Sequence, residues 1–148
     1  MITELVLKNF KSVSEQTYSF TDFDLLVGRN NSGKSTILQS MAIWQYCVDE
    51  FHRMKRAGKS GAQIVLPNFT ALPLPEFNLL WTDKTDRKYP KENGGKRKQV
   101  YIYIEIIVRW QKSDGRLGEF GISLRYHTPQ SIYAIPINGW SEFKTLDA

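Results

Sequence analysis

Cysteine is almost absent from this sequence. Cys47 is the single one, so no disulfide can form within the chain, and nothing indicates an oxidising compartment. Long apolar runs are missing as well, since none approaches the roughly 18 residues that a membrane-spanning helix needs. The first residues also lack the basic and apolar regions of a secretory signal. These absences predict a cytoplasmic protein that does not associate with a membrane.

A strong bias in charge or composition is also missing. Lys and Arg number 20 against 15 Asp and Glu, which gives a net charge of +5, compatible with a polyanionic partner without requiring one. The chain is 41% hydrophobic and 13% aromatic, which excludes a disordered protein. No internal repeat is evident. A length of 148 residues is enough for one domain with a hydrophobic core.

The most informative stretch matches the phosphate-binding pattern G-x-x-x-x-G-K-S/T at every fixed position. It reads Gly28-Arg29-Asn30-Asn31-Ser32-Gly33-Lys34-Ser35-Thr36. An apolar run precedes it and a helical pattern follows it, as this loop requires. The alternative is a Gly-, Asn- and Ser-rich turn between a strand and a helix, and the agreement of loop, strand and helix disfavours it.

Each residue type in this stretch has a chemical reason. Gly28 and Gly33 let the backbone approach phosphate oxygens, because glycine has no side chain and tolerates positive φ. Successive backbone N–H groups and the start of the following helix then attract an anion. Lys34 is expected at the β- and γ-phosphates, where it stabilises charge during catalysis, and the Ser35 hydroxyl at Mg²⁺. The expected ligands are ATP and Mg²⁺. The loop itself does not exclude GTP, but no guanine-reading N-K-x-D pattern appears.

The pattern of apolar residues predicts strands over residues 2–10, 16–20 and 23–27 and a helix over 36–54. The apolar stripe of this helix contains Ile37, Met41, Trp44, Val48 and Phe51, with Leu38 and Cys47 beside it. Trp44, Met41 and Cys47 are residue types that also contact cofactors. At helical spacing they are interpreted as core residues.

The middle of the chain, residues 57–98, is rich in loops and becomes basic. A short strand is expected at residues 63–66 and a turn of helix at 76–81, between prolines. Residues 84–98 then carry seven basic side chains: Lys84, Arg87, Lys88, Lys91, Lys96, Arg97 and Lys98. Such a stretch either contacts nucleic acid or is a solvated loop, and the sequence leaves both interpretations open.

The last part, residues 99–148, predicts an antiparallel meander. Strict alternation indicates a strand over residues 100–110, and Ser113-Asp114-Gly115 is a hairpin turn signal. The return strand alternates over residues 120–126, and a third strand covers 131–135. With residues 1–56 as strands, loop and helix, the prediction is a single mixed α/β (α+β) lobe.

Two segments together resemble one protein group. The short strand with Asn9-Phe10-Lys11-Ser12 and the loop at residues 28–36 look like the amino terminus of ABC-type ATPases of the SMC/RecF/OLD group. These are AAA-family ATP-binding proteins of DNA repair, chromosome maintenance and phage defence. The resemblance covers roughly the first 50 residues. It implies a P-loop NTPase fold of the ABC head type, of which this chain is the amino-terminal lobe with its antiparallel β-subdomain.

The resemblance also implies a set of contacts. Asn30, Asn31, Ser32, Gly33, Lys34, Ser35 and Thr36 would surround the triphosphate, and Lys11 and Ser12 match positions close to the nucleotide. In this group two heads enclose ATP, so a homodimer or head-to-head assembly formed through ATP is expected. DNA and an effector nuclease domain or subunit are the other implied partners.

Other features of the group are missing from these 148 residues. Gly118-Glu119-Phe120-Gly121-Ile122-Ser123 does not fit the signature motif, and no strand ends in Asp-Glu as a Walker B strand does. The nearest candidate, Glu105, falls inside a predicted antiparallel strand, so we interpret it as a solvent-facing side chain. Gln63 matches a Q-loop glutamine by rough position only. We therefore expect ATP hydrolysis only from a longer, complete protein.

Two alternative functions remain. A non-catalytic module in which ATP only drives association fits the same residues. A transport-type ABC subunit would instead need a membrane partner and an aromatic residue before the loop for adenine stacking, and the Asn9-Phe10-Lys11-Ser12 segment favours the DNA-associated group.

Overall fold

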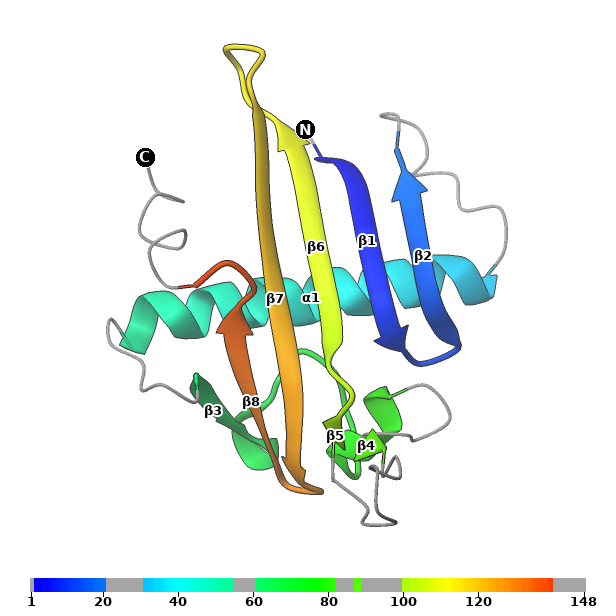
Figure 1. The fold of residues 1–148 in the computed structure, drawn as a ribbon, viewed down its shortest axis with the longest axis vertical. Helices are drawn as coiled ribbons and strands as arrows, with labels where there is room; N and C mark the ends of the chain where they lie inside the picture. Colours follow the sequence, from blue (N-terminus) through cyan, green and yellow to red (C-terminus); the bar gives the residue numbers. More distant parts are fainter. Residues whose placement is uncertain (1, 21–30, 55–60, 82–86, 89–99, 140–148) are drawn as a thin grey trace, which may run out of the picture.

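The computed structural model describes residues 2–20, 31–54, 61–81, 87–88 and 100–139. Within them, one antiparallel sheet has the strand order β2-β1-β6-β7-β8-β3, and the long helix α1 crosses one of its faces (Figure 1). The elements are β1 (Ile2–Phe10), β2 (Val13–Ser19), α1 (Asn31–Met54), β3 (Ala62–Val65), β6 (Ile104–Gln111), β7 (Leu117–Thr128) and β8 (Ser131–Pro136). Two 3-10 helices, η1 (Leu66–Asn68) and η2 (Phe77–Leu80), follow β3, and β4 (Arg87–Lys88) pairs with β5 (Val100–Tyr101).

Strand β1 joins the amino-terminal strand β2 to the meander of the last chain segment. It pairs with β2 on one side, where Leu5 faces Tyr18, and with β6 on the other, where Leu5 faces Val108. The meander β6-β7-β8 is antiparallel, as the sequence predicts. The first and last of the three predicted chain segments therefore share one sheet.

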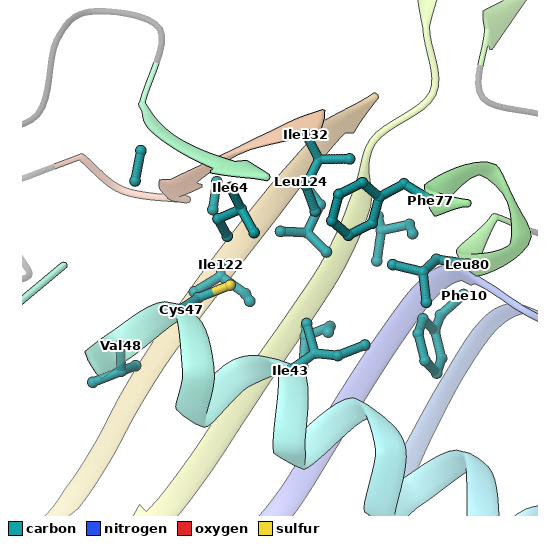
Figure 2. Close-up of a cluster of buried hydrophobic side chains, with 14 of the residues drawn as sticks. Phe10, Ile43, Cys47, Val48, Ile64, Phe77, Leu80, Ile122, Leu124 and Ile132 are labelled. Atoms are coloured by element: carbon teal, nitrogen blue, oxygen red, sulfur yellow. The ribbon is translucent and has the colours of Figure 1, made fainter. Parts of the chain in front are cut away.

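The core lies between the sheet and α1. Alternate residues of the central strands point toward the helix and are buried, because successive side chains of a strand face opposite sides. They include Leu5, Leu7, Ile104, Ile106, Val108, Phe120, Ile122 and Leu124. Figure 2 shows Cys47 of α1 beside Ile122 of β7, with Ile43 of the same helix nearer to Phe10 and Leu80. This arrangement confirms the predicted alternation in β6 and β7.

Helix α1 differs from its prediction in two ways. It begins at Asn31, five positions before the predicted start at Thr36, so its first turn lies inside the phosphate-binding pattern. Its buried stripe runs through Ser40, Ile43, Cys47 and Phe51, whereas the side chain of Leu38 is 49% exposed. The prediction placed Leu38 beside the stripe and omitted Ile43.

The strand predicted over residues 100–110 is interrupted. It divides into β5 and β6, with Ile102 and Tyr103 between them. Side chains donate hydrogen bonds to the two carbonyl oxygens there: Trp81 Nε1 donates to Ile102 O at 2.6 Å, and Asn9 Nδ2 donates to Tyr103 O at 2.9 Å. These donors come from distant parts of the chain, which explains why local alternation did not reveal the interruption.

The other predicted elements are present with shifted ends. The strand expected at 16–20 is β2, which starts three residues earlier, and those expected at 63–66 and 131–135 are β3 and β8. The turn of helix at 76–81 is η2. The predicted strand at 23–27 lies outside the described residues, as does the basic stretch 84–98 apart from β4. Among the helices that the structure describes, none combines the length and apolar character needed to span a membrane.

Candidate functional site

The amino-terminal end of α1 is the centre of the candidate site. Of the predicted phosphate-binding residues, Gly28 and Asn30 lie outside the described part of the chain, whereas the backbone of residues 31–36 forms the first turns of α1. The first four N–H groups of a helix have no partner within the helix. With the helix dipole they favour an anion at this end. The sequence motif and the start of the helix therefore coincide.

Ser35 and Thr36 occupy the second turn of α1. The Ser35 side chain is exposed, so its hydroxyl is accessible to a ligand, and Thr36 is half-buried. Mg²⁺ keeps several waters and takes one or two protein oxygens together with phosphate oxygens. One exposed hydroxyl at a helix end that favours phosphate therefore fits a Mg²⁺ ion that arrives with a nucleotide.

Lys11 approaches the same helix from the turn between β1 and β2. Its Nζ donates a hydrogen bond to Gln39 Oε1 of α1 at 2.5 Å, and burial lowers the pKa of this half-buried ammonium group. Ser12, the next residue, is exposed. The structure thus brings Lys11 to the helix that carries Lys34 and Ser35.

Gln39 is the residue of this arrangement that the sequence analysis missed. The available signal was its position four residues after Ser35, which places both on one face of a helix. That spacing carries meaning only once the partner on β1 is known.

Glu105 does not belong to the site. It lies within β6, between Ile104 and Ile106, and therefore points to the sheet face opposite α1. There its carboxylate pairs with Lys8 Nζ at 3.3 Å. Its interpretation as an outward-facing side chain of an antiparallel strand is confirmed.

Gln63 lies on a strand far in the sheet order from β1 and β2, where Lys11 meets α1. It lies exposed on β3, at the edge opposite β2, whereas Gln39 links the amino-terminal half of α1 to the β1–β2 turn. Figure 1 shows the helix crossing the sheet between these two edges. The structure therefore does not bring Gln63 to the start of α1.

The aromatic residues of α1 serve packing. Trp44 Nε1 donates to Phe120 O at 3.0 Å, and its ring packs edge-on against Trp110 and Phe120. Cys47 is fully buried, and this burial raises the pKa of its thiol. Their interpretation as core residues is confirmed.

Comparison with known proteins identifies the family of the chain. A family model described as an AAA ATPase domain matches residues 1–113, a range that includes the motif at 28–36 and both Lys11 and Gln39. A search among curated proteins finds no match. The AAA ATPase domain points to ATP binding, typically with Mg²⁺. Because the matched range covers most of the sequence, the chain belongs to the AAA ATPase domain family.

Proposed function

We propose that this chain is the ATP-binding lobe of a DNA-associated ATPase of the SMC/RecF/OLD type, with residues 28–36 as its phosphate-binding loop. One observation carries the proposal: α1 begins at Asn31, within the motif. A polyphosphate at this end would accept hydrogen bonds from N–H groups that have no partner in the helix. The family match supports the same ligand.

The roles of the side chains follow from the positive charge of lysine and from the preference of Mg²⁺ for oxygen ligands. Lys34 would neutralise negative charge on the β- and γ-phosphates, and the Ser35 hydroxyl would hold Mg²⁺. When bound, Mg²⁺ neutralises further phosphate charge and orients the phosphates for attack by water. Lys11 would add a second ammonium group from the β1–β2 turn. These residues bind and orient the triphosphate; no residue of the described chain is assigned to activate the water.

Isothermal titration with ATP in the presence of Mg²⁺ tests this proposal. We expect the wild-type chain to bind ATP and Lys34→Ala to lose binding by about tenfold or more, because a charge-assisted contact to phosphate contributes about 1.5–3 kcal/mol. Ser35→Ala should reduce the dependence of affinity on Mg²⁺. Equal affinity of Lys34→Ala and wild type would contradict the proposal.

The proposed assembly is a head-to-head pair formed through ATP. Size-exclusion chromatography with and without ATP and Mg²⁺ tests it on the wild-type chain and on Lys34→Ala. An ATP-dependent shift to the dimer position that Lys34→Ala lacks is the expected result. If the protein remains monomeric at saturating ATP, assembly by this lobe alone would be excluded.

The proposed contact with DNA rests on the charge of residues 84–98. Within this stretch, β4 supplies Arg87 and Lys88, which pair with β5 just before β6. Replacing the seven basic residues by Gln should weaken DNA binding and lower its dependence on salt, because fewer counterions are released. Unchanged binding and an unchanged salt slope would argue against this stretch as the contact.

A further inference from the structure

The backbone at the turn between β1 and β2 has an unusual conformation. Asn9 and Lys11 are non-glycine residues in the left-handed region, with φ of 58° and 51°. This conformation costs free energy for residues with a Cβ and persists where the surroundings fix it. Asn9 Nδ2 donates to Tyr103 O at 2.9 Å, and the Lys11 N–H donates to Leu80 O at 2.8 Å. The Lys11 side chain therefore starts from a backbone held by η2 and by the segment between β5 and β6.

The position of the turn is fixed from a third side. Phe10, between the two left-handed residues, is fully buried and forms an isolated antiparallel bridge with Trp81. The Trp81 indole is itself tied to Ile102 O at 2.6 Å. This part of the turn cannot shift without disturbing the core.

The Lys11 ammonium group contacts an uncharged partner. It donates a hydrogen bond of 2.5 Å to Gln39 Oε1, and within the described part of the chain no carboxylate forms an ion pair with it. An amide oxygen accepts a hydrogen bond from an ammonium without cancelling its charge. A half-buried cation with a neutral partner favours an anion nearby, because burial leaves its charge poorly solvated.

Gln39 directs this charge toward the start of α1. It follows Ser35 by four residues, so the two lie on one helix face about 6 Å apart along the axis. Helical side chains lean toward the amino terminus, which carries Gln39 in the direction of Ser35. The contact thus places the Lys11 ammonium group along the first turns of the helix, where residues 31–36 lie.

We propose that Gln39 is a positioning residue, which holds the Lys11 ammonium group in place to contact the phosphates of the bound nucleotide. The inference rests on the proposed function of residues 28–36. Gln39 acts through Lys11, and Lys11 acts with Lys34 on the triphosphate. Two cations then contact the phosphates, one from the loop and one from the β1–β2 turn. The affinity for a nucleotide therefore depends on how many phosphates it carries.

A double-mutant cycle tests the coupling. The variants are Lys11→Met, Gln39→Met and the combination, and the measured quantity is the dissociation constant for ATP, ADP and AMP with Mg²⁺. We expect Lys11→Met to weaken ATP binding by about tenfold and Gln39→Met by about threefold to fivefold. The double variant should bind no more weakly than Lys11→Met. Losses should be largest for ATP and smallest for AMP, a dependence that a merely structural role would not produce.

Gln45→Met is the matched control. Gln45 is an exposed glutamine of α1 that bonds to Asp49 on the same helix, so its replacement should leave all three affinities unchanged. Gln39→Ala provides a second variant, and urea unfolding of each variant shows that it folds. The inference would be overturned if the losses of the two single variants simply multiply in the double variant, if Gln39→Met has no effect, or if the losses for ATP and AMP are equal. In each case Lys34→Ala would still weaken ATP binding. Absence of ATP binding by the wild type would overturn the proposed function and this inference together.

Discussion

The indole nitrogen of Trp44 donates a hydrogen bond to the Phe120 carbonyl oxygen at 3.0 Å, which ties the middle of α1 to strand β7. The Trp44 ring also packs edge-on against Trp110, with 6.3 Å between ring centroids, and against Phe120 at 6.2 Å. Such pairs are worth about 0.5–1.5 kcal/mol beyond the area they bury. This contact holds the middle of α1 against the sheet.

Replacing Trp44 by Phe keeps an aromatic ring and removes the hydrogen bond. The Phe120 carbonyl oxygen then loses this donor, so the free energy of unfolding should fall by about 0.5–1.5 kcal/mol. Urea unfolding measures the change. Gln45→Ala, on the exposed side of the same helix, should change stability by no more than about 0.5 kcal/mol. Equal effects of the two substitutions would argue against Trp44 as the residue that fixes α1.

Gly118 is required by the Trp110 side chain. A Cβ built at Gly118 would overlap the indole of Trp110, so Gly118→Ala forces that ring to move. The displacement would disturb the Trp44–Trp110 contact and should cost about 1–3 kcal/mol, as for other overpacked sites. Thermal unfolding checks this. Leu117→Ala, at the neighbouring and highly exposed residue, serves as the control and should be nearly neutral.

Cys47 should make the folded state less stable at alkaline pH. Burial raises the pKa of its thiol in the folded chain, whereas an unfolded cysteine has a pKa of about 8.5. Above that pH the unfolded chain releases a proton that the folded chain keeps. The Cys47 contribution to stability is therefore complete below about pH 8 and decreases at higher pH, by up to about 1.4 kcal/mol per pH unit.

The measurement is urea unfolding of wild type and Cys47→Ala at pH 7.5, 8.5 and 9.5, values chosen to span the unfolded pKa. Cys47→Ala removes the ionisable group, so its stability should fall less steeply with pH than that of the wild type. Parallel pH dependences would contradict the burial of a neutral thiol. In the folded wild type, Cys47 should also resist alkylation.

ATP hydrolysis by this chain alone should be very slow or absent. The sequence offers no aspartate at the end of an apolar strand, and Glu105, the nearest candidate, pairs with Lys8 on the sheet face opposite α1. Binding and charge neutralisation without a group that orients the attacking water leave most of the barrier in place. Phosphate release over many turnovers measures this. A rate typical of complete ATPases that Lys34→Ala abolishes would contradict the expectation.

Local pattern was enough to predict much of the fold. Alternation located β1, β6, β7 and β8, since each has one face buried in the core. It did not reveal that β1 lies between β2 and β6, because strand order depends on packing between distant segments. Nor did it reveal the interruption at Ile102 and Tyr103, where the donors are Trp81 and Asn9.

The candidate site was predicted to a similar extent. The motif identified residues 28–36, because phosphate binding by backbone N–H groups requires a fixed spacing of residue types. The resemblance added Lys11. Gln39 was not found, because its role depends on a contact across 28 residues of chain that only the packed structure brings together. The early start of α1 was missed because Asn31 and Ser32 resemble loop residues as much as the first turn of a helix.

Hydrogen exchange at the start of α1 tests the central claim most directly, because it locates the ligand. If residues 28–36 bind the phosphates of ATP, the backbone amides of residues 31–36 should exchange more slowly when ATP and Mg²⁺ are added. Adenosine should produce no such protection, and Lys34→Ala should abolish it. Unchanged exchange of these amides at saturating ATP, or protection only elsewhere in the chain, would contradict the account.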